Sequence, residues 1–483
     1  MPTISIYYDL ETSSLSPVGQ ILNYSFCVVD ENWKVLDEFS GKIKVSRGQL
    51  PEPEAILANR VDVLELQEDP TAKNERDSMY DILMFIEKSI KKYGVTSLIG
   101  YNNIRFDLPY LRTSLIRNGL NPYFKQSGGD WTQLDNKDVL HAVQFCMIGN
   151  TGFRNLIHNH LNLENPNKLS LTLQTVCSAL GILKGKQLHE SKFDVALTIA
   201  LAKELAINYD IDIRSLRNYA PQSTTICNKA FPNYDLTTGQ SFLSATMANL
   251  DDNKNYSLWI DLDKYKDGKG RESIQWFNKK TSTFFISYRP IKKEYNDLAE
   301  KALEEFAGIN LENFFPEKNC DAEAFIYMVS FKGIEALRAA IWQKNYEPIK
   351  ALDDFWTNEL YRRYLINNYT WRNEPENIKE AARDKKILDM LKDYAEYRYG
   401  GEMKINKFDT ESEWQEGIES EDFHPPLKML VTKIKNLTPE DNTHLDYPLM
   451  KSLLKFYKDS DIVKLFGKEL LKKEETTNET STV

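Results

Sequence analysis

The sequence has few cysteines and none in a metal-binding arrangement. Five cysteines are scattered over 483 residues, and no Cys-x-x-Cys occurs. An odd, scattered set argues against both a zinc module and a disulfide framework. No run of about 18 apolar residues is present, so we expect no membrane span. The N-terminus also lacks a basic region followed by an apolar stretch, so we expect no signal peptide and a reducing, cytoplasmic location.

An excess of positive charge is also missing. The chain has 61 Lys and Arg against 71 Asp and Glu, a formal net charge of −10. This balance argues against a generic polyanion binder. The net charge is still compatible with a nucleic-acid partner, because a single groove can be basic while the remaining surface is acidic. Acidic ligands of a metal site also add to the negative total without repelling substrate once metal is bound.

The composition is that of a folded protein with more than one domain. Hydrophobic residues make up 41% and charged residues 27%, which predicts a sizeable core. A chain of 483 residues suits two to four domains. Strand patterns followed by helical patterns predict an α/β unit over residues 1–208. A β-rich unit is expected over residues 209–320, a helical unit over 321–473 and a disordered, Thr- and Glu-rich tail over 474–483.

Four short acidic clusters are the main functional signal. Asp9 and Glu11 follow an apolar run that predicts a buried strand, and a spacing of two puts both carboxylates on one face. Buried unpaired charges are costly, and hard divalent cations with oxygen ligands are their usual compensation. The other clusters contain Asp107, Asp138 and the pair His189 and Asp194. Together they suggest metal-assisted phosphoryl chemistry.

Each cluster also has an ordinary structural interpretation. Asp9 and Glu11 are also compatible with a solvent-exposed strand end. Asp107 stands where a helix is expected to begin, which suits an N-cap. His189 lies five residues before Asp194, in a predicted loop, where it is either an exposed side chain or a mobile general base. The combination and order of the clusters favour the catalytic interpretation.

That combination resembles the DEDDh 3′–5′ exonucleases, whose core is RNase H-like, and more closely the exonuclease I family. The resemblance rests on three strings: Tyr8-Asp9-Leu10-Glu11-Thr12, Gly100-Tyr101-Asn102-Asn103-Ile104-Arg105-Phe106-Asp107 and His189-Glu190-Ser191-Lys192-Phe193-Asp194-Val195. The strong match covers about 200 residues, and the second string is the most specific of the three. The resemblance implies an exonuclease core with a mixed sheet, then an SH3-like β-rich domain and an α-helical C-terminal domain.

The resemblance also implies an activity and a set of roles. Single-stranded DNA would be degraded from its 3′ end to 5′-mononucleotides, in DNA repair or recombination. Asp9, Glu11, Asp107 and Asp194 would hold two Mg²⁺ ions, with Mn²⁺ as a substitute, and His189 would deprotonate the attacking water. Asp138 would then be a structural acid or one that supports the ligands. We expect a monomer without membrane contact, and a single-strand DNA-binding protein is a candidate partner.

Three residues are candidates for substrate contact under the same resemblance. Glu11 and Thr12 would lie beside the terminal nucleotide. The family often has a basic residue at the position of Thr172, so a weaker grip on the terminal phosphate is expected here. Elsewhere, arginines alternate with aromatics, as in residues 361–364, 369–372 and 397–399. Such stretches suit single-strand binding but equally suit ordinary helix packing.

Two rival functions fit parts of the pattern. A 3′–5′ RNase or a proofreading-type exonuclease would share the catalytic core. The roughly 270 residues after that core favour the exonuclease I organisation, because minimal RNases of the superfamily lack them. The third interpretation is a non-catalytic single-strand-binding protein whose nuclease core has lost catalytic residues. Decay would remove at least one ligand or the histidine, and all five residues are present.

Overall fold

We describe the protein from a computed structural model. The structure describes residues 3–14, 19–46, 51–117, 120, 134–161, 169–183, 191–216, 230–249, 256–278, 283–285, 293–307 and 446–459. His189, the three stretches in which arginines alternate with aromatics, most of the predicted helical domain and the predicted tail lie outside these residues. Within the described segments, no helix combines the length and apolar character needed to cross a membrane.

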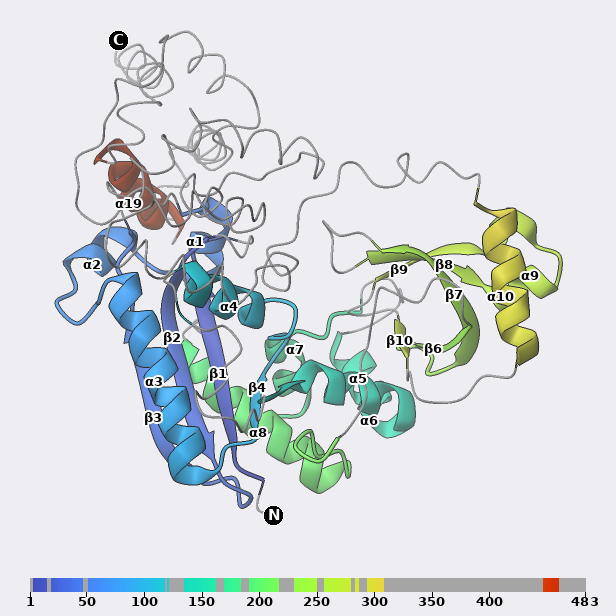
Figure 1. The fold of residues 1–483 in the computed structure, drawn as a ribbon, viewed down its shortest axis with the longest axis horizontal. Coiled ribbons are helices and arrows are strands. Elements are labelled where there is room, and N and C mark those ends of the chain that lie inside the picture. Colours follow the sequence, from blue (N-terminus) through green and yellow to red (C-terminus); the bar gives the residue numbers. More distant parts are fainter. Residues whose placement is uncertain are drawn as a thin grey trace, which may run out of the picture.

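A mixed five-stranded sheet forms the centre of the N-terminal part (Figure 1). Its order is β3-β2-β1-β4-β5, with antiparallel pairing of β1 to β2 and β2 to β3, and parallel pairing of β1 to β4 and β4 to β5. The strands are β1 (Ser5–Thr12), β2 (Ile21–Val29), β3 (Val35–Lys42), β4 (Ser97–Gly100) and β5 (Asp135–Asp138). The predicted mixed α/β core is therefore confirmed.

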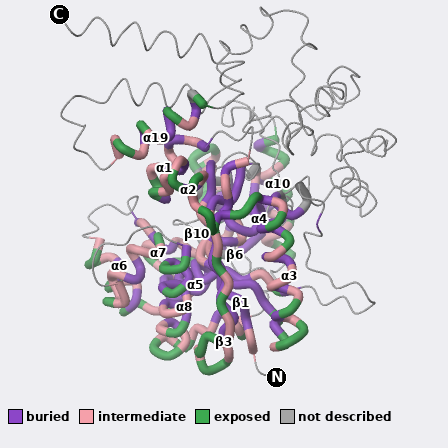
Figure 2. Tube along the Cα trace, turned by 90° about the vertical axis from the view of Figure 1, so that its left-hand side faces the viewer, coloured by how far each residue is buried: buried purple, intermediate pink, exposed green. Residues whose placement is uncertain are grey.

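Helices pack on both faces of this sheet, and successive residues of each strand point to opposite faces. On one face Ile6 and Tyr8 pack against α3 (Glu75–Tyr93) and α4 (Asp107–Arg117). On the other face Tyr7 belongs to a core formed with α5 (Val139–Gly149), α6 (Thr151–Leu161), α7 (Leu173–Ala179) and α8 (Ser191–Asn208). Figure 2 shows the buried residues running along β1 between these helices. Odd-numbered residues of β1, which include Asp9 and Glu11, thus share the face covered by α8.

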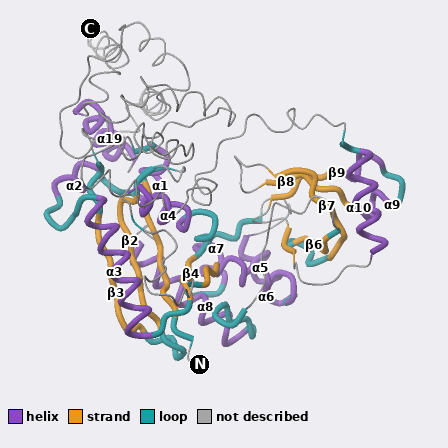
Figure 3. Tube along the Cα trace, in the orientation of Figure 1, coloured by secondary structure: helices purple, strands orange, loops and turns teal. Residues whose placement is uncertain are grey.

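A second five-stranded sheet follows in the chain (Figure 3). It is antiparallel, in the order β10-β6-β7-β8-β9. Its strands are β6 (Phe231–Asp235), β7 (Ser241–Asn249), β8 (Tyr256–Asp261), β9 (Ile274–Asn278) and β10 (Thr283–Phe285), and α9 (Leu262–Lys266) and α10 (Lys293–Glu305) accompany it. Ala245 and Ile260 share a core with Ala299 and Ala302 of α10. This sheet lies within residues 209–320, and both the extent of the predicted β-rich domain and its SH3-like assignment stay predictions.

The last described helix, α19 (Asp446–Asp459), packs on the N-terminal part of the protein. Met450, Leu453, Leu454 and Tyr457 share a core with Leu22 of β2 and with residues of α1 (Pro53–Asn59) and α2 (Val63–Glu68). A contact between segments almost 400 residues apart has no local signal in the sequence.

Two elements expected from the sequence begin later than their pattern predicts, for local reasons. Apolar residues spaced by three and four predict a helix over residues 169–180, but it begins at Leu173, because the Thr172 hydroxyl caps it by accepting from Thr175 N. Alternating residues predict a strand over residues 33–45, but the strand ends at Lys42 and begins only at Val35, because Trp33 lies in the preceding turn with φ 66°. The elements α1, α2, β5, α5, α6, β6, β7 and α9 were not predicted.

Candidate active site

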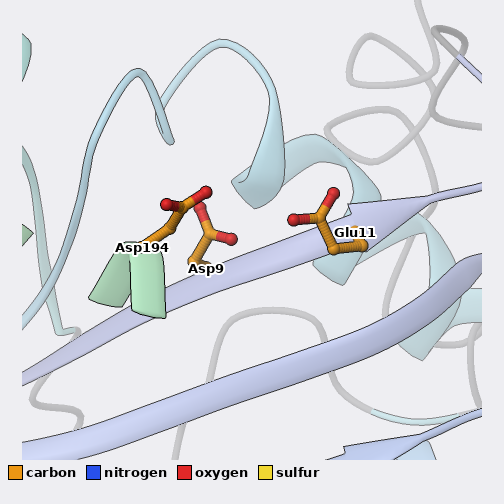
Figure 4. Close-up of side chains that lie close together, drawn as sticks. All are labelled: Asp9, Glu11 and Asp194. Carbon is orange, nitrogen blue, oxygen red and sulfur yellow. The ribbon is translucent and has the colours of Figure 1, made fainter. Parts of the chain in front are cut away.

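The structure brings three of the predicted acidic residues together. Asp9 and Glu11 project from the same side of β1, and Asp194 reaches them from the first turn of α8 (Figure 4). One carboxylate oxygen from each of these residues lies within 4.8 Å of the others. Asp194 is buried, whereas Asp9 and Glu11 are half-buried. A set of oxygen ligands with this spacing could hold a hard divalent cation.

Asp107 joins this cluster through the backbone of β1. It is the first residue of α4, and its Oδ1 accepts a hydrogen bond from Leu10 N, 3.0 Å away. Leu10 lies between Asp9 and Glu11 in the strand. Asp107 is not one of the three residues whose oxygens lie within 4.8 Å of one another, but Asp194 acts on its pKa. The buried Asp107 carboxylate therefore stands at the edge of the cluster.

The turn between β4 and α4 restricts which residues can occupy it. A Cβ on Gly100 would lie 2.6 Å from Asn103 Cβ and 2.9 Å from Tyr8 O, so only glycine fits at this position. Asn102 has a φ of 58°, a left-handed conformation that asparagine tolerates better than most residues. The Tyr101 hydroxyl donates to Leu171 O at 2.5 Å, which ties the turn to the residues before α7. These features explain much of the specificity of the Gly-Tyr-Asn-Asn string.

Asp138 supports the same turn and does not join the carboxylate cluster. Its Oδ1 accepts from Asn102 N at 2.7 Å and from Leu140 N at 3.0 Å, which caps α5. The residue is fully buried, and burial raises its pKa to about 6. Among the described residues Asp138 lies outside the potential ligand set, and these contacts fit the structural role expected from the sequence.

Burial and neighbouring carboxylates both raise the pKa values of the cluster. Burial, together with the charges of Asp194 and Asp107, raises the pKa of Glu11 to about 8. Burial also raises the pKa of Asp107 to about 8, although the hydrogen bond from Leu10 N opposes the shift. The pKa of Asp9 rises well above its usual value through burial and the charges of Asp107, Glu11 and Asp194. Positive charge from a bound cation would relieve this repulsion.

Comparisons with known proteins found relatives in both sequence and structure. No family model matches the chain. Exodeoxyribonuclease I of Escherichia coli (strain K12) is 27% identical over 202 residues, which are 41% of this chain and 39% of the relative. Crystal structures of E. coli exonuclease I, one with a dT13 oligonucleotide and one a metal-free complex with single-stranded DNA, match with TM-scores of 0.54 and 0.55.

The chain has the exonuclease I fold. The two structures cover 94% and 95% of this chain and 99% of their own length, at 17% identity. The similarity in fold therefore extends far beyond the sequence match, which spans about two fifths of the curated relative. The resemblance to the exonuclease I family predicted from the three motifs is confirmed.

Within the exonuclease I fold, the predicted substrate residues occupy distinct positions. Thr12 is buried at the end of β1, and its hydroxyl donates to Ser14 O at 3.0 Å. Thr172 is exposed as the N-cap of α7, and its Oγ1 lies 2.8 Å from Thr175 Oγ1. His189 lies outside the described residues. The roles of all three stay predictions. Sequence reasoning missed the link from Tyr101 to Leu171, because no periodic pattern marks a side chain that bonds a distant carbonyl.

We expect the metal-free protein to lose stability as the pH rises toward about 8. Glu11 and Asp107 have folded-state pKa values of about 8, whereas unfolded Glu and Asp titrate near about 4.3 and 3.9. The folded state holds more protons between these values, so the free energy of unfolding falls as the pH increases through this window. A divalent cation that binds only the folded state should restore stability.

Thermal unfolding with chelator and with Mg²⁺, at about pH 5 and about pH 8, measures both effects. The stabilisation by Mg²⁺ should be larger at the higher pH, where the carboxylates must lose fewer protons to bind the ion. A melting temperature that does not respond to Mg²⁺ at the higher pH would contradict the metal assignment.

Proposed function

We propose that this chain is a metal-dependent 3′–5′ exodeoxyribonuclease that acts on single-stranded DNA and releases 5′-mononucleotides, in DNA repair or recombination. The observation that carries the proposal is the convergence of Asp9, Glu11 and Asp194 at the end of β1 in a chain with the exonuclease I fold. Solved structures of E. coli exonuclease I contain dA16 or dT13 oligonucleotides, and one is a zinc-bound complex with single-stranded DNA. These relatives support a single-stranded DNA substrate and a metal cofactor.

The carboxylates fit a cation site for a chemical reason. The charged neighbours that shift the pKa of Asp9 and Glu11 are all other carboxylates. Burying several negative carboxylates together is costly in free energy without a compensating positive charge. We propose that Asp9, Glu11, Asp107 and Asp194 hold two Mg²⁺ ions, for which Mn²⁺ can substitute. When bound, the ions supply an activated water and stabilise charge on the attacking and leaving oxygens.

The remaining roles belong to the protein side chains. His189 accepts the proton of the attacking water, and its place before α8 suits a residue that approaches bound substrate. Glu11 and Thr12 lie at the end of β1 and contact the terminal nucleotide. Thr172 faces the terminal phosphate with a neutral hydroxyl, which is already the acceptor for Thr175 N at 3.2 Å. A neutral group at this position gives a weaker grip than a cation would.

We predict a strong preference for single strands with a free 3′ end. Linear single-stranded DNA should be shortened from that end, whereas blunt duplex and circular single strands should resist. Binding should weaken with rising salt despite the net charge of −10, because the contact surface sets the number of released counterions. Initial rates on the three substrates, at matched 3′-end or strand concentrations, provide the measurement. Equal rates on blunt duplex, or cleavage of circles, would contradict the proposal.

Two further measurements separate the rival functions. An RNA oligonucleotide of identical sequence that is degraded faster than DNA would favour a 3′–5′ RNase. Binding of single-stranded DNA without any cleavage in Mg²⁺ or Mn²⁺ would favour a non-catalytic binding protein.

We propose that the active form is a monomer and that a single-strand DNA-binding protein is a candidate partner. Sedimentation of the protein alone and with such a partner tests both points.

A further inference from the structure

The strand that carries Asp9 and Glu11 is held at its end by the segment around α1. Asn59, the last residue of α1, donates from Nδ2 to Thr12 O at 2.8 Å in a buried contact. Glu52 N donates to Ser13 O at 2.6 Å. Both acceptors lie within two residues of Glu11. These two hydrogen bonds hold the end of β1 against the segment around α1.

Helix α19 is anchored to the same segment. The Tyr457 side chain is fully buried, and its hydroxyl donates to Pro51 O at 2.5 Å. Ser452 Oγ donates to Asp62 Oδ1 at 2.5 Å, and Arg60 forms an ion pair with Asp446. Figure 1 shows α19 beside α1 and α2, in agreement with the apolar core that these helices share.

Two of these hydrogen bonds meet on one peptide group. The carbonyl of Pro51, which accepts from Tyr457, and the N–H of Glu52, which donates to Ser13, belong to the same peptide unit. A continuous chain of hydrogen bonds therefore runs from α19, through the Pro51–Glu52 peptide, to the end of β1. Adjacent hydrogen bonds of this kind polarise and strengthen one another. A flanking proline on each side of Glu52 further limits the freedom of this peptide.

We propose that Tyr457 is a positioning residue for the carboxylates of β1, acting through the Pro51–Glu52 peptide. The inference rests on the proposed function. The hydroxyl of Tyr457 links α19, through the Pro51–Glu52 peptide, to Ser13, the residue that follows β1. The apolar side chains of α19 hold the helix in place, and the hydroxyl transmits that position to Ser13, two residues after Glu11. The C-terminal end of the chain thus contributes to the chemistry without contacting substrate.

A hydroxyl deletion tests this proposal against a purely structural role. Tyr457→Phe keeps the ring in its apolar site and removes only the hydrogen bond to Pro51 O. Ser452→Ala is the matched control, because it removes a hydrogen bond of the same length from α19 that ends on the α2 cap Asp62 instead. Amide hydrogen exchange reports the Glu52 N–H directly. Cleavage of a short, labelled single-stranded DNA oligonucleotide reports the chemistry.

We expect Tyr457→Phe to speed exchange of the Glu52 amide by about 2- to 12-fold, the worth of one hydrogen bond. The kcat on this oligonucleotide should fall by a factor in the same range, with KM unchanged. Ser452→Ala should leave both quantities at the wild-type value even if it lowers the melting temperature. Unchanged Glu52 exchange, or faster exchange with an unchanged kcat, would overturn the proposal.

An inactive wild-type protein would instead refute the proposed function. In that case, Mn²⁺ affinity measured by calorimetry decides the positioning claim, because displaced carboxylates bind the ion less tightly. Weaker Mn²⁺ binding by Tyr457→Phe but not by Ser452→Ala would support the coupling between α19 and β1. Equal affinities in the three proteins would overturn it.

Discussion

Replacing Glu11 by glutamine should abolish turnover while the protein stays folded. A ligand carboxylate supports metal-ion stabilisation of the transition state, which is worth several kcal/mol, so we expect a loss of about 10³-fold or more. The metal-free variant should be at least as stable as wild type at about pH 8, because the substitution removes a charge from a cluster of repelling carboxylates. Asp194→Asn should likewise abolish turnover.

Single-turnover cleavage of a labelled single strand in saturating Mg²⁺, combined with thermal unfolding in chelator, measures both effects. Glu68→Gln is a suitable control, because Glu68 is an exposed glutamate at the end of α2. It should leave turnover and stability unchanged. Turnover of Glu11→Gln within a factor of a few of wild type would refute the assignment of Glu11 as a ligand.

The second large effect is expected at His189. A positioned general base contributes about 10² to 10⁴ in rate, so His189→Ala should lose a factor in that range. Metal binding and single-strand affinity should persist, because the histidine is not a ligand in this account. Affinity is measured in Ca²⁺, and cleavage in Mg²⁺. His160→Ala is the matched control, since His160 is exposed on α6.

The pH profile separates a base from other roles. A histidine must be neutral to accept a proton, so wild-type activity should fall on the acid side of its pKa, for which the unperturbed value is about 6.5. With Mg²⁺ saturating at every pH, so that protonation of the ligands does not limit the rate, His189→Ala should lose that acid limb. Full activity of the variant would remove the histidine from the mechanism, and loss of metal binding together with activity would make it a ligand.

The core of the site could be predicted because its signals are local. A two-residue repeat in β1 fixes Asp9 and Glu11 on one face. The Gly100 to Asp107 string is long because a tight turn excludes most residues: Gly100 has no room for a Cβ, and Asn102 has a positive φ. Such constraints appear in the sequence as unusual residues in a fixed order.

Contacts between distant segments could not be predicted in the same way. Tyr457 bonds to Pro51, 406 positions away, and Asp446 pairs with Arg60, 386 positions away. No periodicity links residues so far apart. Asp138 was also ambiguous, because a buried acid that caps a helix and one that binds metal look alike in a sequence. Only the partners of its carboxylate, Asn102 N and Leu140 N, distinguish the two.

The most direct test of the account is the fate of one linear single-stranded DNA labelled at its 5′ end in one sample and its 3′ end in another. In Mg²⁺ the 5′-labelled sample should give a ladder of progressively shorter strands. The 3′-labelled sample should release its label at once as a mononucleotide. Chelation of the metal, or Glu11→Gln, should leave both strands intact. Intact DNA with the wild-type protein in Mg²⁺, internal fragments, or release of the 5′ label first would contradict a 3′–5′ exonuclease at this site.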